Sequence, residues 1–120
     1  MIEQNQGFPR TLRLLKAAEF KKVFTNPVKS TDHYFTLLAT PSESGSPRLG
    51  LAIAKKMIKR AVDRNLIKRT VRESFRLQQQ NIGSIDIVAL AKKEALDASP
   101  EVLRKSLETH WLKLFSKCAS

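Results

Sequence analysis

Three short stretches of the chain have the pattern of apolar residues that is typical of β-strands. Residues 33–40 (HYFTLLAT) are aromatic and rich in strand-forming residues, and they stop at a proline. In residues 48–54 (RLGLAIA) bulky Leu and Ile alternate with Gly and Ala, so this strand has one bulky and one small face. The small face would leave room for a helix or a ligand. Residues 85–91 (IDIVALA) are predicted to form the third strand.

A short helix is predicted before the first strand, at residues 16–25. Phe20, Val23 and Phe24 lie at three- and four-residue spacing and share one side of it. The helix ends before Pro27, because a residue that precedes proline avoids the helical conformation. Two aromatic residues on a short helix more often belong to a core. The neighbouring lysines raise the alternative that the rings stack on single-stranded nucleic acid, because aromatic faces and cations together suit such a ligand. Both roles stay open on the residues alone.

Two longer helices are predicted in the second half of the chain. The first covers about residues 60–80 and stops within residues 81–84, which contain a glycine. The second has Ser99 as its N-cap and Pro100 at its first position, and it continues to about residue 117. Its apolar stripe consists of Val102, Leu103, Leu107, Trp111, Leu114 and Phe115.

The predicted order is therefore helix, strand, strand, long helix, strand, helix. This order predicts an α+β fold, a two-layer sandwich of one mostly antiparallel sheet with helices packed on it. A chain of 120 residues without a long linker is expected to form a single domain, residues 1–120. We interpret residues 1–15 as a basic arm, extended or partly mobile, that lies along this domain.

Composition points to a polyanionic partner. The net charge is +11 and the pI is near 10.2, which favours nucleic acid because counterion release rewards each phosphate contact. The single cysteine, Cys118, cannot form an internal disulfide, which fits a reducing cytoplasm. No apolar run is long enough to span a membrane, and no signal sequence is recognised.

The positive charge concentrates on the long helix. Residues 59–76 contain seven Lys or Arg residues and only two acids, Asp63 and Glu73. At about 100° per residue, five of the bases cover an arc of about 160°. The residues that fall mainly on the other side, and are predicted to pack on a core, are Val62, Leu66, Ile67, Thr70, Val71 and Leu77. A solvated, salt-bridged helix would need more acids, and a membrane-surface helix would need larger apolar residues. We call these five residues the basic face: Arg60, Arg64, Lys68, Arg72 and Arg76.

The candidates for catalytic chemistry are few. His33 and His110 are far apart in sequence, and His110 is predicted to be a surface residue near the end of the last helix. No zinc-ligand spacing, phosphate-binding glycine loop or nucleophile elbow is present. A stand-alone nuclease is therefore poorly supported. Composition alone supports two functions equally: a ribosomal or general RNA-binding protein, and a subunit that takes part in RNA processing.

Three motifs together resemble the bacterial ribonuclease P protein family. They are LGLAIAKK at residues 49–56, RAVDRNLIKR at 60–69 and RESFR at 72–76, and the resemblance extends over residues 8–115. It implies a small basic subunit bound to a large catalytic RNA. The assembly would be an endoribonuclease that removes the 5′ leader of precursor tRNA in the cytoplasm, with Mg²⁺ bound mainly by the RNA. No catalytic or metal-ligating residue is expected in this chain.

The resemblance also implies which residues touch RNA. The long helix is expected to face the catalytic RNA, although Leu66 stands where the family's Arg-Asn-Arg motif has its second Arg. A cleft between the first helix and the sheet is expected to receive the leader. The strands around the long helix would be joined by an unusual left-handed crossover. The catalytic-RNA contacts are Arg60, Arg64, Asn65, Lys68, Arg69, Arg72 and Arg76, and the leader contacts are Phe20, Phe24, Phe35, Lys55 and Lys56.

Overall fold

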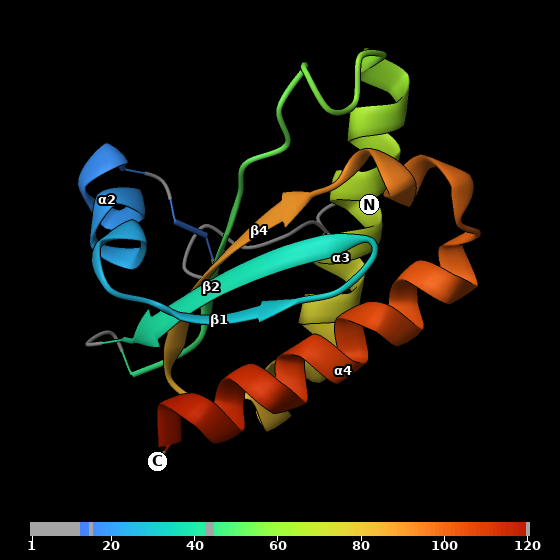
Figure 1. Cartoon of the computed structure of the whole chain (residues 1–120). Coiled ribbons are helices and arrows are strands. Elements are labelled where there is room, and N and C mark those ends of the chain that lie inside the picture. Colours follow the sequence, from blue (N-terminus) through green and yellow to red (C-terminus); the bar gives the residue numbers. More distant parts are fainter. Residues whose placement is uncertain (1–12, 15, 43–44, 120) are drawn as a thin grey trace, which may run out of the picture.

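A computed structural model describes residues 13–14, 16–42 and 45–119 (Figure 1). Most of the basic arm predicted at residues 1–15 lies outside the described residues. The elements, in chain order, are α2 (Ala17–Thr25), β1 (Val28–Thr31), β2 (Phe35–Pro41), β3 (Arg48–Leu51), α3 (Ala61–Ile82), β4 (Ile85–Ala91), the 3₁₀ helix η2 (Lys93–Asp97) and α4 (Pro100–Ala119).

The predicted α+β class and the three predicted helices are confirmed, but one strand was missed. β1 has only four residues and pairs with β2 alone, at the edge of the sheet. Its sequence, VKST, is too short and too polar to give a strand pattern. The second predicted strand is also shorter than expected, because β3 ends at Leu51. The third, β4, has the predicted bounds.

The four strands form one sheet in the order β1-β2-β4-β3. β1 with β2 and β2 with β4 are antiparallel, and β3 with β4 is parallel, so the sheet is mostly antiparallel as predicted. α3 connects the two parallel strands. The left-handed sense of that crossover, which the family resemblance implies, stays a prediction.

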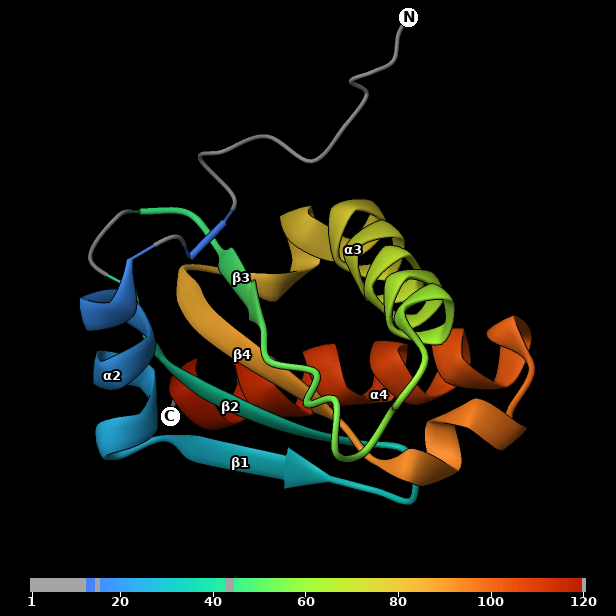
Figure 2. The same ribbon diagram turned by 90° about the horizontal axis from the view of Figure 1, so that it is seen from above.

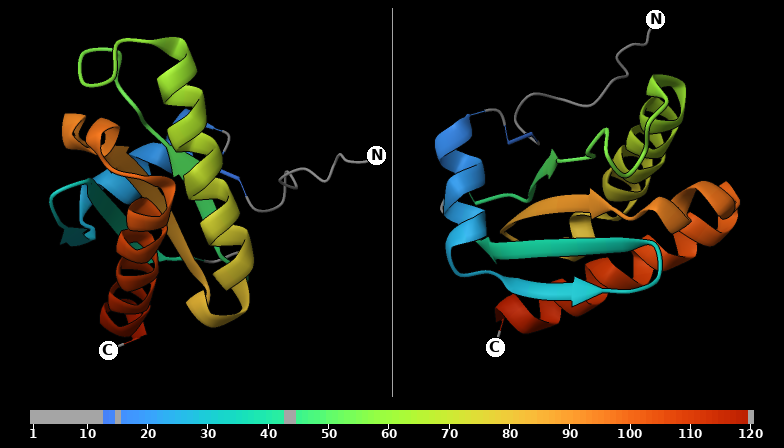
Figure 3. Two further views of the ribbon diagram at one scale, coloured as in Figure 1. Left: turned by 90° about the vertical axis from the view of Figure 1, so that its right-hand side faces the viewer. Right: turned by 45° about the horizontal axis from the view of Figure 1, so that its top comes forward.

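The main core lies between one face of the sheet and the helices α3 and α4. These helices run side by side in the same general direction (Figure 3). The Nε1 atom of Trp111 donates a hydrogen bond to Oγ of Ser74 at 2.9 Å, and the Trp111 ring meets Phe75 edge to face. Gly83 ends α3 with φ +88°, and a Cβ there would lie 2.1 Å from Cε1 of Phe115. A glycine is therefore required by both the backbone conformation and the packing.

The side of α3 that packs on the core differs in part from the prediction. Its buried residues are Ile67, Thr70, Val71, Ser74, Phe75 and Ile82. Val62, Leu66 and Leu77, which were predicted to lie on the packing side, are 59%, 48% and 68% exposed. They fall on the flank of the helix, beyond the narrow strip that the sheet and α4 cover.

α2 lies on the opposite face of the sheet, as the view from above shows (Figure 2). A second, smaller cluster of Leu14, Val23 and Val88, with Phe20 and Leu38 packed against it, joins α2 to that face. The sheet and the α3/α4 pair form the predicted two layers, and α2 covers part of the far side. This arrangement leaves α2 and α3 on different faces of the sheet, with β3 between them.

His110 was predicted to be a surface residue, and this prediction is wrong. It is 2% exposed and lies under the sheet, where its Nδ1 is 2.6 Å from Oγ of Ser30 and its Nε2 is 3.1 Å from Oδ2 of Asp32. The helix pattern was misleading because the partners come from β1 and the turn after it. Although these three residue types also form hydrolase triads, Ser30 is 4% exposed, so the hydroxyl is not accessible to a substrate.

Candidate nucleic-acid interface

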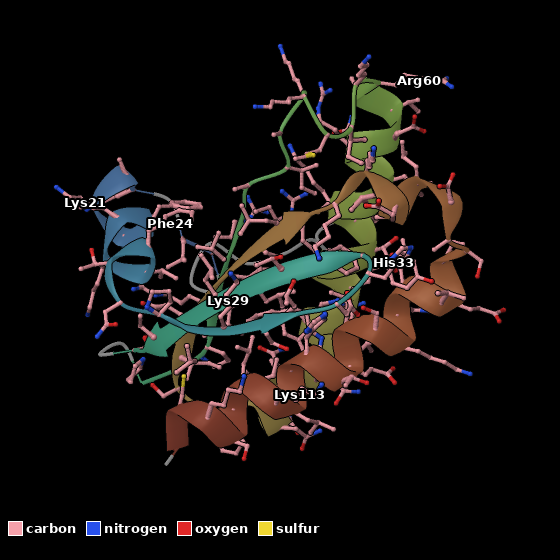
Figure 4. The ribbon with its side chains drawn as sticks, viewed as in Figure 1. Lys21, Phe24, Lys29, His33, Arg60 and Lys113 are labelled. Carbon is pink, nitrogen blue, oxygen red and sulfur yellow. The ribbon has the colours of Figure 1, made fainter. Side chains whose placement is uncertain are left out.

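The basic face lies along α3, with Arg60 at the start of the helix (Figure 4). Arg60 and Arg76 are exposed, and the three bases between them are half-buried. Asn65 and Arg69 are exposed beside them. In residues 16–42 and 45–119, the one ion pair found on this face joins Arg60 to Asp63 at 3.9 Å. Because this ion pair is exposed and long, it neutralises little charge. The basic face therefore stays strongly cationic.

Arg64 also has a structural role on this face. Its Nη1 donates hydrogen bonds to the carbonyl oxygens of Ile58, at 2.9 Å, and Lys59, at 2.8 Å. Ile58 is fully buried, so the guanidinium holds the segment before α3 against the helix. A substitution of Arg64 would therefore combine a loss of charge with a local structural change, whereas Arg69 offers a cleaner probe of charge.

Lys68 and Arg72 point from α3 into a pocket of about 190 Å³ that reaches across β3 to α2. Burial lowers the pKa of the Arg72 guanidinium, and the neighbouring positive charge of Arg13 lowers it further. Partly buried cations held close together favour the entry of an anion. The pocket is lined by Arg13, Leu14, Phe20, Leu49, Gly50, Leu51, Lys68 and Arg72.

Phe20 forms the α2 side of this pocket and lies directly on Gly50. A Cβ at Gly50 would be 2.6 Å from Cε1 and Cζ of the Phe20 ring. The small face predicted for β3 thus packs against α2 and, beside that contact, lines a pocket. Phe24, one turn later, is 46% exposed on the side of α2 nearer the strands, whereas Lys21 points away from them (Figure 4).

The structure does not bring all the predicted leader contacts together. Phe35 is 1% exposed and belongs to the main core beneath the sheet, so its predicted contact with the leader is wrong. The alternation along β2 directs Phe35 and Leu37 to the α3/α4 face and Leu38 to the α2 face. Lys55 and Lys56 are exposed in the turn between β3 and α3. The segment that joins these two elements runs away from α2 toward the start of α3 (Figures 1 and 2).

An ion cluster that the sequence did not reveal joins α2 to the sheet. Arg48 donates to both carboxylate oxygens of Asp86 at 2.9 Å, from Nε and Nη2, and its Nη1 donates to Oε2 of Glu19 at 2.7 Å. The hydrogen bonds to Asp86 raise the pKa of Arg48, against the opposing effect of burial. No spacing rule connects residues so far apart in sequence. The parallel register of Arg48 with Asp86 places them side by side.

The described residues offer little for metal binding or covalent chemistry. No group of three or more His, Cys, Asp or Glu residues among them is arranged to hold a metal ion. Cys118 is a free, half-buried cysteine, and burial raises the pKa of its thiol. Within the same part of the chain, no helix has the length and apolar character needed to cross a bilayer.

Comparisons with known proteins agree with this geometry. The family model described as Ribonuclease P matches residues 8–115. The ribonuclease P protein component of Methylococcus capsulatus is 48% identical over 116 residues, which are 97% of this chain and 91% of that protein. The corresponding protein of Idiomarina loihiensis is 47% identical over 118 residues, 98% of this chain and 94% of that protein.

Solved structures show the same fold. The Staphylococcus aureus RNase P protein superposes with a TM-score of 0.78 at 30% identity, over 87% of this chain and 97% of that one. The Thermotoga maritima protein gives a TM-score of 0.77 at 26% identity, over 84% and 96% of the two chains. The chain therefore belongs to the ribonuclease P protein family, the protein subunits of a tRNA-processing endoribonuclease.

Proposed function

We propose that this subunit binds the catalytic RNA of ribonuclease P through α3. The observation that carries this proposal is the row of cations along the helix, which has a single weak ion pair among the described residues. Arginine suits this role because its planar group can grip a phosphate with two donors. The proposed contacts are Arg60, Arg64, Asn65, Lys68, Arg69, Arg72 and Arg76.

The 5′ leader of precursor tRNA is the proposed ligand of the α2 side. Phe20 lines the pocket that Lys68 and Arg72 enter from α3, and Phe24 is exposed one turn along α2. Aromatic rings beside cations suit single-stranded nucleic acid, because bases stack on the rings while phosphates meet the charges. Lys55 and Lys56 are proposed as leader contacts from the turn before α3.

Hydrolysis is assigned to the RNA subunit. The resemblance to the ribonuclease P protein family implies that Mg²⁺ is bound mainly by the RNA, and the proposal follows this implication. When bound there, Mg²⁺ supplies an activated water and stabilises developing charge. The protein would assist by binding and orienting the substrate RNA in the cytoplasm. The comparisons offer no support for the alternative of a general RNA-binding protein.

The test of this proposal is the affinity for the matching catalytic RNA, measured across a range of salt concentrations. Arg69→Ala should weaken binding by about 1–3 kcal/mol and reduce the slope of log K against log salt by about one unit. Lys105→Ala, at an exposed position on α4, removes the same charge away from α3 and is the matched control. Equal affinities and equal slopes for both variants would contradict the proposal.

A further inference from the structure

Arg48 stands at the junction of three elements. It begins β3, its bidentate partner Asp86 is on β4, and its third contact, Glu19, is in the first turn of α2. The side chain of Asp86 is 2% exposed, and those of Arg48 and Glu19 are 22% and 25% exposed. The cluster is thus shielded from solvent well enough to hold its geometry, unlike a surface ion pair.

The strand register places this cluster directly beside the pocket. Arg48 is paired with Asp86 and Gly50 with Val88 in the parallel ladder, and residues two apart on a strand face the same way. Arg48 and Gly50 therefore both point to the α2 side of the sheet. The neighbouring residue of Glu19, Phe20, rests on Gly50.

Glu19 uses its two carboxylate oxygens for two different tasks. Oε1 accepts a hydrogen bond from the backbone N–H of Lys16 at 3.0 Å, which caps the start of α2. Oε2 accepts the hydrogen bond from Arg48. One side chain thus fixes both where the helix begins and where it stands on the sheet.

We propose that the Arg48–Glu19 pair is a positioning clamp that sets the placement of α2, and with it the distance from the Phe20 ring to Lys68 and Arg72 across the pocket. Neither clamp residue is among the pocket-lining residues, so the pair acts through Phe20. This inference rests on the proposed binding of single-stranded RNA by the α2 side. It assigns leader selectivity to two residues that need not touch the leader.

Glu19 is the residue to change, because Arg48 cannot be removed cleanly. In Glu19→Ala, Arg48 keeps both hydrogen bonds to Asp86, so no buried charge loses its partner. Glu19→Gln keeps the size of the side chain and an oxygen for the Lys16 N–H. Its amide NH2 group cannot accept the hydrogen bond from Arg48, so the clamp loses both the negative charge and the acceptor. Glu101→Gln, an exposed acid in the first turn of α4, is the matched control.

The functional test is a double-mutant cycle between Glu19→Ala and Phe20→Ala in the reconstituted ribonucleoprotein. The readout is the ratio of affinities for precursor tRNA and mature tRNA. Phe20→Ala should lower this ratio by about fivefold or more, the expected loss of one stacked base. Glu19→Ala should also lower the ratio, and Glu19→Gln should give a ratio between those of the wild type and Glu19→Ala. The ratio of the double variant should be no lower than that of Phe20→Ala alone.

A second measurement tests the clamp in the protein alone, without RNA. Amide hydrogen exchange in α2 should become faster in Glu19→Ala and also in Glu19→Gln, which keeps the cap at Lys16. Exchange in α3 and α4 should stay unchanged, and Glu101→Gln should leave α2 unchanged. Unaltered exchange in α2 would overturn the clamp, and additive losses in the cycle would overturn its action through Phe20. If Phe20→Ala leaves the ratio unchanged, the proposed leader site is wrong and the functional role of the clamp fails with it, even if α2 exchange confirms the clamp itself.

Discussion

The ring of Phe20 occupies the space that a side chain at Gly50 would need, with only 2.6 Å from Cε1 to the position of a Cβ. Helix α2 approaches the sheet this closely because β3 presents a glycine at that point. The contact also forms one wall of the pocket that Lys68 and Arg72 enter from the other side of β3. Packing and the proposed RNA site therefore depend on the same pair of residues.

Gly50→Ala tests this dependence. The added methyl group must push the half-buried Phe20 ring away, and it would also lie 3.2 Å from Cβ of Leu14. We expect a loss of about 1–3 kcal/mol in the free energy of unfolding, measured by urea denaturation. Preference for precursor over mature tRNA should fall as well. A variant that retains full stability and full preference would show that the contact is not tight.

Arg48→Met is expected to be more damaging to the fold. It leaves the carboxylate of Asp86, 2% exposed, without its guanidinium, which typically costs about 3–5 kcal/mol. Urea denaturation should show a lower midpoint with an unchanged slope. Adding Asp86→Leu should recover part of the loss, because a buried ion pair can be replaced by apolar residues at little cost. If the second change brings no recovery, the loss comes from packing rather than charge.

The buried His110 predicts a pH dependence of stability. Burial lowers its pKa below the ordinary value of 6.5, although the nearby carboxylate of Asp32 opposes this and Lys113 and Lys92 add to it. The unfolded chain therefore takes up a proton that the folded chain resists. The free energy of unfolding should fall as the pH drops below about 6.5.

Comparison of the urea midpoints at neutral and mildly acidic pH checks this prediction. His110→Asn should remove the change between them, whereas His33→Asn, at an exposed position, should keep it. A dependence that survives in His110→Asn would contradict the assignment.

A second loss of stability is expected at lower pH from Asp32. Burial alone would raise its pKa, but hydrogen bonds from Ser106 and from the backbone N–H groups of Phe35 and Tyr34 outweigh burial and bring the pKa to about 2. Its stabilising effect is present above the ordinary value of 3.8 and is lost as the pH falls toward 2. Asp32→Asn should flatten the acid limb of the stability profile. An unchanged limb would show that other carboxylates cause the acid unfolding.

Leu66→Arg should strengthen binding of the catalytic RNA. Leu66 is 48% exposed on α3, where the family motif has an arginine, so the longer side chain can reach solvent without disturbing the core. We expect unchanged stability, tighter binding and a salt slope larger by about one unit. An unchanged slope would place this flank of α3 outside the interface.

The elements with strong periodicity were predictable from sequence. β4 and the start of α4 at Ser99 were located well, because a continuous apolar run and a capping sequence are local signals. β1 was missed because four mixed residues gain their strand conformation only from pairing with β2. His110 was misplaced because its partners, Ser30 and Asp32, come from a distant part of the chain.

The candidate site shows the same division. The basic face followed from the helical spacing of its residues, and the small face of β3 predicted a neighbour there. Phe35 was assigned to the cleft by resemblance, and only the sheet register shows that it points into the main core. The link from Arg48 to Glu19 and Asp86 depends on three elements meeting in space, for which one sequence holds no signal.

The proposed role of this chain is to support cleavage by the catalytic RNA of ribonuclease P, with α3 as the RNA-binding surface. The most direct measurement is leader release from a precursor tRNA at low Mg²⁺ by the matching catalytic RNA, alone and with each protein. Wild type and Lys105→Ala should stimulate cleavage strongly, and Lys68→Ala/Arg69→Ala should do so only at much higher protein concentration. No stimulation by a folded wild-type protein, or equal stimulation at equal concentration by all three, would contradict this proposed role.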